Sequence, residues 1–554
     1  MKRFVIIISL FQFCLVAAVA QLSWAKKATK SVFMLKTFNA SGELLGSATG
    51  FFIGEQGEGV SCYAPFRGAY QAVVIDAAGK EYPVECMLGA NDTYDVAKFR
   101  VATKKSVPLS VATATEGSPV WLMPYLEQKK LPEGSIRKLE TFMTEYEYYT
   151  VAMTMPDNAA GSPLMNEQGE VVGLMQQPYS EADTLCYAVS ARFADSLRIS
   201  GLSINDPALR ATNLKKDLPA TLDQAILTLY VANGSQDSAT FVQLIEDFIR
   251  KFPDAADGYI YRAQMETNAR QFEAARQDME QAIKVTDKKD EAHYSYAKLI
   301  YEKELYMADT PYDKWSFDLA LSEAREAEQI NPLSVYIHQQ AVILFAQHKY
   351  EEAYQVYERL LQSDMRSADM FYEASRCKEM QKDTLAQLAL LDSCVAMFSK
   401  PYLREAAPYI FARAQARDFA GRYREAVFDY NDYESLMATQ VNARFYYVRH
   451  RAEIGGRLYQ QALNDINKAI DMESDNEFYY AERASLQVRV GLYDDAIASA
   501  ETCVKLAPDQ SDGYLFLGLA QCLKGQKDEG VKNLLKAKEL GDAQADELIE
   551  KYSK

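Results

Sequence analysis

Histidine, the side chain that most often serves as a general base near neutral pH, is absent from the first half of this sequence. The 554-residue chain has four histidines, all beyond residue 292: His293, His338, His348 and His450. A serine or cysteine nucleophile normally needs a base beside it, because the neutral hydroxyl or thiol attacks poorly. We therefore do not expect conventional Ser–His or Cys–His hydrolysis from residues 1–292.

No motif indicates a metal ion or a cofactor. The glycine-rich run at 54–59 lacks the Lys-Ser or Lys-Thr pair that completes a phosphate-binding loop, and it is typical of a hairpin turn. The sequence has no HExxH pair and no Cys/His cluster with zinc-site spacing. The acidic run at 91–95 lacks the calcium-loop pattern. We expect neither a metal nor a cofactor.

Arginines recur at equivalent positions in the second half of the chain, each shortly after an aromatic residue. They are Arg262, Arg413, Arg449 and Arg483, and the aromatic residues include Tyr447 and Tyr480. A row of planar guanidinium groups could bind the carboxylates or the backbone of a ligand. Alternatively, the aliphatic stems pack between helices while the charged heads pair with neighbouring Asp or Glu. The sequence leaves both interpretations open.

These arginines lie within a repeat that carries a small residue three positions after an aromatic or apolar one. The small positions include Ala275, Ala320, Ala353, Ala426, Ala462 and Ala496, with 36 residues from Ala426 to Ala462 and 34 from Ala462 to Ala496. A period of about 34 residues with helical spacing is similar to the tetratricopeptide repeat. The resemblance implies about eight or nine helix pairs over residues 220–549, stacked into an all-α solenoid whose groove binds peptides or proteins.

Residues 31–200 have a different pattern, which predicts β structure. Short apolar runs end at Gly, Asn, Asp or Pro, and turn signals recur about every 8 to 12 residues, as in sandwiches and barrels. Residues 201–219 contain two prolines and little periodicity, so we expect a linker there.

Three segments of the β-rich half carry ordered motifs. They are ATGFFIGEQGEGVSCYAPF at 48–66, NDTYDVAKFRV at 91–101 and PDNAAGSPLMNEQGEVVGL at 156–174. In this order they resemble the trypsin-like serine proteases, particularly the bacterial high-temperature-requirement type. The resemblance implies a double β-barrel over residues 26–200. It places the catalytic histidine at Ala64, the aspartate at Asp95 and the nucleophile at Ala160, so we expect a catalytically degenerate domain.

Two nearby residues offer an alternative chemistry. Ser162 could act as a displaced nucleophile, but no histidine in this half could accept its proton. Cys62 could attack only as a thiolate, and no cation is clearly placed in the sequence to favour that form. A peptidase with an unconventional site, or one completed by a partner chain, therefore stays as an alternative.

The N-terminus has the pattern of a secretory signal. Lys2 and Arg3 precede an apolar run, and Ala18 and Ala20 supply small residues for cleavage after residue 20, with cleavage at about residue 25 as a second option. We expect an exported protein of the periplasm or cell envelope; secretion, or anchoring by an uncleaved signal, are the alternatives. The net charge of −17 argues against nucleic acid as a partner.

The sequence thus predicts a multi-domain β + α protein: a trypsin-like double β-barrel followed by an all-α tetratricopeptide-repeat solenoid. We expect it to bind proteins or peptides without catalysis, through the repeat groove and the degenerate protease cleft. In a further alternative, the β domain is only a structural spacer and the repeats alone bind.

Overall fold

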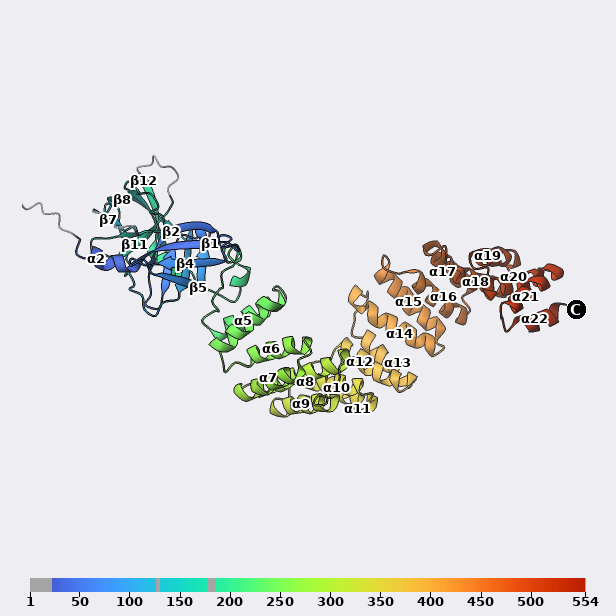
Figure 1. The fold of residues 1–554 in the computed structure, drawn as a ribbon. Helices are drawn as coiled ribbons and strands as arrows, with labels where there is room; N and C mark the ends of the chain where they lie inside the picture. The colour runs from blue at the N-terminus through green and yellow to red at the C-terminus, as the bar shows by residue number, and fades with distance from the viewer. Residues whose placement is uncertain (1–21, 126–129, 178–184, 554) are drawn as a thin grey trace, which may run out of the picture. The chain divides into compact units, whose positions relative to one another are not determined.

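The computed structural model describes residues 22–125, 130–177 and 185–553. The predicted signal peptide at 1–20 lies outside these ranges. The chain divides into two compact units, residues 1–286 and 287–554. The first unit contains two β-barrels and the first helices of the repeat region, and the second is built from helices (Figure 1).

Six antiparallel strands close the first barrel. Inside it, Phe33, Leu35 and Thr37 of one strand are fully buried, in alternation with partly exposed neighbours, and the Phe33 ring contacts the rings of Phe52 and Phe99. This alternation is what places one face of each strand in the core. In pairing order the strands are β1 (Val32–Phe38), β2 (Leu44–Phe52), β3 (Glu58–Ser61), β6 (Val96–Val101), β5 (Glu81–Asn91) and β4 (Gln71–Ile75).

A second closed barrel of six strands follows. Its core contains the fully buried side chains of Val120, Leu122, Tyr149, Val151 and Leu164. In pairing order the strands are β10 (Pro163–Met165), β11 (Val171–Met175), β12 (Leu185–Ser190), β9 (Tyr146–Ala152), β8 (Glu133–Phe142) and β7 (Pro119–Leu122). The predicted double barrel is therefore confirmed.

Residues 201–219, which the sequence predicts as a linker, connect the barrels to the helices and pack against both. The Met87 N–H donates to the Lys215 carbonyl at 2.7 Å, and the Tyr63 hydroxyl donates to the Ala208 carbonyl at 2.8 Å. Ala208 lies in the short helix α3 (Pro207–Arg210), and the buried side chains of Leu209 and Leu214 join the core of this barrel. The two prolines do not prevent this packing, because the burial of apolar side chains fixes the path of the segment and no regular helix or strand is needed.

The remaining described residues form helices that succeed one another in antiparallel pairs. In the first unit they are α4 (Leu222–Asn233), α5 (Ser238–Lys251), α6 (Ala256–Asn268) and α7 (Phe272–Val285). In the second unit they are α8 (Lys289–Tyr306), α9 (Phe317–Ile330), α10 (Ser334–Ala346), α11 (Tyr350–Leu360), α12 (Ala368–Met380), α13 (Thr384–Val395), α14 (Ala407–Phe419), α15 (Tyr423–Met437), α16 (Ala443–Gly455), α17 (Tyr459–Met472), α18 (Glu477–Arg489), α19 (Tyr493–Leu506), α20 (Ser511–Lys524), α21 (Lys527–Glu539) and α22 (Ala545–Tyr552). No helix among the described residues has both the length and the apolar character needed to cross a bilayer. The predicted all-α region after the barrels is confirmed.

Small residues allow the helices of a pair to approach closely. The six alanines of the repeat pattern, from Ala275 to Ala496, are all fully buried. In the pair α20–α21, a Cβ added to Gly518 would come within 2.7 Å of the Gly530 carbonyl oxygen. Larger residues at these positions would push the helices apart, which explains why the small position recurs along the chain.

A left-handed backbone residue lies two positions before the second helix of many pairs. Its φ ranges from 60° to 95°, and the residues are Arg270, His348, Lys382, Gly421, Arg457, Gly491 and Gly525. Such a residue ends one helix and turns the chain into the next. Glycine adopts this conformation readily, whereas a side chain there costs about 1–2 kcal/mol.

Replacing Gly491 tests this turn geometry. A Cβ at Gly491 would meet no atom within 4 Å, so only the φ of 78° opposes a side chain. Gly491→Ala should lower the free energy of unfolding by about 1–2 kcal/mol, seen as a lower urea midpoint in circular dichroism. Gly234→Ala is the matched control, because Gly234 also ends a helix in open space but has a φ of −101°. Equal losses in the two variants would contradict this explanation.

Candidate functional site

The three positions that the sequence assigns to a protease triad line one cleft in the first unit. Ala64 and Asp95 come from the first barrel, and Ala160 comes from the loop before β10 of the second barrel. The cleft has a volume of about 320 Å³, and its other lining residues are Leu45, Gly46, Ser47, Ala48, Cys62, Pro65 and Gln177. The Thr49 N–H donates to the Ala160 carbonyl at 3.0 Å and so joins the two walls.

Asp95 is held at the cleft by backbone contacts. It lies between β5 and β6 with a φ of 49°, a left-handed conformation that aspartate tolerates better than most residues. Its Oδ1 accepts the Ala64 N–H at 2.6 Å, and its carbonyl oxygen accepts the Tyr63 N–H at 3.3 Å. Burial raises the pKa of Asp95, and the hydrogen bonds from Ala64 and from the Cys62 thiol oppose that rise. The carboxyl group is therefore partly desolvated but anchored.

The loop that carries Ala160 requires glycine at one position. Gly161 has a φ of 80°, and a Cβ there would come within 2.1 Å of the Thr49 carbonyl oxygen. The Gly161 N–H donates to the Met175 carbonyl at 2.8 Å, and the Met175 N–H returns a bond to the Ser162 carbonyl at 3.0 Å. These bonds tie the loop to β11, so the position of Ala160 is fixed by backbone geometry and does not depend on its own side chain.

A family model for the trypsin-like peptidase domain matches residues 48–174, which span all three lining positions. The match falls within the two closed barrels, which run from Val32 to Ser190, and it assigns a trypsin-like peptidase domain to this part of the chain. Among solved structures, an HtrA-type protease with a tripeptide is similar over 34% of this chain and 65% of its own, at 16% sequence identity and a TM-score of 0.29.

Parts of the chain are also similar to tetratricopeptide-repeat proteins. Small glutamine-rich tetratricopeptide repeat-containing protein 2 of Saccharomyces cerevisiae is 29% identical over 93 residues, which are 17% of this chain and 27% of that protein. Heat shock protein STI1 of the same yeast is 36% identical over 83 residues, 15% of this chain and 14% of that protein. The Protein SGT1 homolog of Bos taurus is 29% identical over 87 residues, 16% of this chain and 26% of that protein. The chain thus spans between 14% and 27% of the length of these relatives.

The two alternative nucleophiles of the trypsin-like domain are poorly placed for attack. Ser162 is fully buried, and among the described residues its hydroxyl has no hydrogen-bond partner. Cys62 lines the cleft but is 3% exposed, and its Sγ lies 3.9 Å from the Met175 carbonyl oxygen. Burial, and then the charge of Asp95, raise the pKa of Cys62 well above its ordinary value, so the group is a thiol at neutral pH.

One edge of β2 borders the cleft without a strand beside it. β2 pairs with β1 along most of its length, but on its other side the described residues of β3 pair only with Gly50–Phe52. Residues 45–48 therefore present an edge to the cleft, next to the Thr49–Ala160 hydrogen bond. Unpaired strand edges of this kind can accept an extended polypeptide as an additional strand.

All four histidines lie in the second unit, and each has a partner there. His450 fills a fully buried position, where its Nδ1 donates to the Ala462 carbonyl at 2.8 Å, and burial lowers its pKa. The other three contact Glu323, Glu373 and Tyr350. His450 thus packs inside the helical region, whereas His348 lies exposed in the turn between α10 and α11.

The recurring arginines mostly bind acids of the same scaffold. Each of three arginines holds, with two nitrogens, an aspartate sixteen residues later on the second helix of its pair. The pairs are Arg262–Asp278 at 2.6 and 2.8 Å, Arg413–Asp429 at 3.0 and 2.7 Å, and Arg449–Asp465 at 2.6 and 2.9 Å. Two hydrogen bonds between a guanidinium group and a carboxylate fix both the position and the orientation of the arginine side chain.

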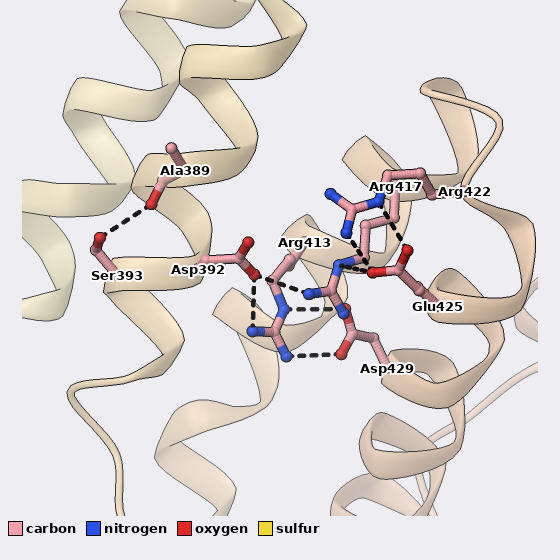
Figure 2. A network of polar contacts seen from close by, with 8 residues as sticks. All are labelled: Ala389, Asp392, Ser393, Arg413, Arg417, Arg422, Glu425 and Asp429. Atoms are coloured by element: carbon pink, nitrogen blue, oxygen red, sulfur yellow. Dashed lines mark hydrogen bonds and ion pairs between the residues drawn. The ribbon is translucent and has the colours of Figure 1, made fainter.

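Figure 2 shows how one of these arginines joins three successive helices. Arg413 and Arg417 of α14 lie between Asp392 of α13 and Asp429 of α15. Arg417 donates to Asp392 at 2.8 Å and to Asp429 at 2.8 Å. The positive charges of the two arginines are therefore matched by the negative charges of the two aspartates. The structure therefore places the guanidinium groups of Arg262, Arg413 and Arg449 within the scaffold, as in the second interpretation of the sequence, and not free for a ligand.

Arg483 departs from this pattern. Serine replaces aspartate at the equivalent position, and the Arg483 Nε donates to the Ser499 hydroxyl at 3.0 Å while Nη1 donates to Asn467 at 2.9 Å. Its guanidinium lies 5.1 Å from the Tyr480 ring centre. Tyr447, the other predicted aromatic, packs against Phe478 and His450. These aromatic residues contribute to helix packing in the second unit.

The potential metal ligands and the cysteines of the described residues were also located. No group of three or more His, Cys, Asp or Glu side chains there could hold a metal ion. The described cysteines are buried, including Cys377 and Cys394, for which burial raises each pKa to about 12.

A buried carboxyl that the sequence did not indicate lies beside Arg449. Glu453 is 4% exposed, and its Oε1 lies 3.9 Å from the Arg449 Nε. Burial, followed by repulsion from Asp465, raises the pKa of Glu453 to about 8. Arg449 also contacts Glu434 at 2.6 Å, so one guanidinium faces three carboxyl groups and one of them retains its proton near neutral pH.

Glu453 should make the stability of the repeat region depend on pH. Between its ordinary pKa of 4.5 and about 8, the folded state holds more protons than the unfolded state, so stability falls as pH rises through this window. Glu453→Gln removes this titration, and its gain in urea midpoint over the natural protein should grow between pH 5 and pH 8.

Glu434→Gln is the control for that measurement. The pKa of Glu434 is lowered, chiefly by the hydrogen bond from Arg449 acting against burial, so its replacement should cost stability at both pH values. A pH-independent difference for Glu453→Gln would contradict the assignment.

Proposed function

We propose that this chain is a non-catalytic binding protein whose trypsin-like domain keeps its cleft for an extended polypeptide. The observation that carries the proposal is the pair of alanines, Ala64 and Ala160, which flank Asp95 in an open cleft where a triad would have an imidazole and a hydroxyl. No histidine occurs in residues 1–292. The domain thus has the frame of a peptidase site without the groups that perform the reaction.

The shape of the cleft supports binding of an extended chain. The edge of β2 at residues 45–48 offers backbone groups, and the space beside Ala64 and Ala160 can take a side chain. A polypeptide added to such an edge gains main-chain hydrogen bonds, while pockets along it supply specificity. Neither the buried Ser162 nor the protonated Cys62 would cleave it.

The helical repeats supply a second surface for proteins. Solenoids of this kind present helix faces to partner proteins. The similarity to tetratricopeptide-repeat proteins supports a role in protein binding. We propose that the protein captures or scaffolds partners, with the cleft and the repeats both contributing.

We further propose that the protein acts in the cell envelope after export. The charged start and apolar run of the N-terminal sequence support export. Cell fractionation with N-terminal sequencing tests this location: a mature chain beginning near residue 21 or 26 outside the cytoplasm is expected, and an intact cytoplasmic chain would contradict it.

Restoring the missing groups tests the proposed loss of catalysis. The natural protein should not react with a fluorophosphonate, which labels activated serines. Ala64→His combined with Ala160→Ser should gain labelling, because the backbone that positions both residues is present. Ala160→Ser alone is the control, since it adds a hydroxyl without a base. Labelling of the natural protein would contradict the proposal.

Filling the cleft distinguishes binding there from binding by the repeats alone. Ala160→Trp should place an indole in the cleft and weaken the binding of an unfolded polypeptide, such as reduced and alkylated ribonuclease A, in fluorescence anisotropy. Ala77→Trp is the matched control, because Ala77 lies on an exposed turn outside the cleft. Equal affinities of the two variants and the natural protein would favour a β domain that is only a spacer.

A further inference from the structure

The carboxyl group of Asp95 lines the cleft, and no cationic side chain of the described residues forms an ion pair with it. Asp95 forms no ion pair among the described residues, and its carboxyl accepts only backbone and thiol hydrogens. Arg67 attracts the Asp95 carboxyl group, but it forms its own ion pair with Asp92. A partly buried anion is thus left without a counter-charge beside a cleft of about 320 Å³.

The cleft walls are suited to a side chain with an aliphatic stem. Leu45, Ala48, Pro65 and Ala160 form apolar surfaces, and Asp95 is the one acid among the residues that line the cleft. Lysine and arginine have this build, since their methylene stems bury along apolar surface while the head carries the charge. A purely apolar side chain would desolvate the carboxyl group further without replacing its lost hydrogen bonds to water.

We propose that the cleft recognises a lysine or arginine side chain of the bound polypeptide, with Asp95 as its counter-charge. This inference rests on the proposed function and names the side chain that the cleft selects. The cationic N–H groups would donate to the carboxylate where an imidazole would otherwise stand, forming charge-assisted hydrogen bonds. Burial raises the pKa of Asp95, and a cation would reverse that effect. The net charge of −17 also favours the approach of basic chains.

A reporter at the cleft rim separates binding there from binding to the repeats. Leu45 lines the cleft and is 45% exposed, so Leu45→Cys in the full chain can carry a trifluoromethyl label, whereas the seven described natural cysteines are buried. Fluorine NMR then follows two titrations. The first uses n-butylguanidinium, with n-butanol as its neutral counterpart, and the second uses reduced and alkylated ribonuclease A.

We expect n-butylguanidinium to shift the reporter in a saturable way and n-butanol to leave it unchanged. Asp95→Asn, which keeps an oxygen for the Ala64 N–H, should weaken guanidinium binding by about tenfold or more. Glu81→Gln is the matched control and should have no effect, because Glu81 is an exposed acid of the same barrel outside the cleft lining and its replacement leaves the Arg67–Asp92 ion pair intact.

Equal binding of guanidinium and butanol, or equal binding by the natural protein and Asp95→Asn, would overturn the inference. If the polypeptide shifts the reporter while guanidinium does not, the inference fails and the proposed function stands. If the polypeptide does not shift the reporter, the proposed function of the cleft fails. Should Asp95→Asn not fold, the comparison of guanidinium with butanol on the natural protein still decides the matter.

Discussion

The contact between Thr49 and the loop at Ala160 and Gly161 is the constraint on which the cleft depends. The Thr49 N–H donates to the Ala160 carbonyl at 3.0 Å, while the Gly161 α-carbon lies so close to the Thr49 carbonyl that a Cβ would come within 2.1 Å of it. Both barrels meet there through backbone atoms. The residue types at positions 64 and 160 therefore do not set the positions of the walls, and substitutions there would leave the cleft in place.

The helical region is held by a different kind of interaction. Buried alanines let each pair of helices approach, and arginines such as Arg413 then connect neighbouring helices through aspartates. Buried ion pairs of this kind add little net stability, because desolvation offsets much of their attraction. At Glu453, burial and then repulsion from Asp465 raise the pKa of the carboxyl group to about 8.

The sequence predicts the fold well because each part has a local or periodic signal. The repeated alanines define the helix pairs, and the ordered motifs around Ala64, Asp95 and Ala160 define the cleft. Other features depend on contacts between distant residues. The path of residues 201–219 follows from burial of Leu209 and Leu214 against a barrel, which no local pattern indicates. Each of three arginines pairs with an aspartate sixteen residues later. This spacing is visible in the sequence, but it indicates a contact only when the two helices are known to lie side by side.

Photo-crosslinking from the cleft in the native cell tests most directly whether the cleft binds a chain without cutting it. A benzophenone amino acid at Leu45, which lines the cleft, is compared with one at Tyr70, which is 52% exposed and lies outside the lining. A partner crosslinked through position 45 and not through position 70, and recovered at full length, is the expected result. Recovery of a partner cleaved at the crosslinked segment, or equal crosslinking from both positions, would contradict a binding cleft without catalysis.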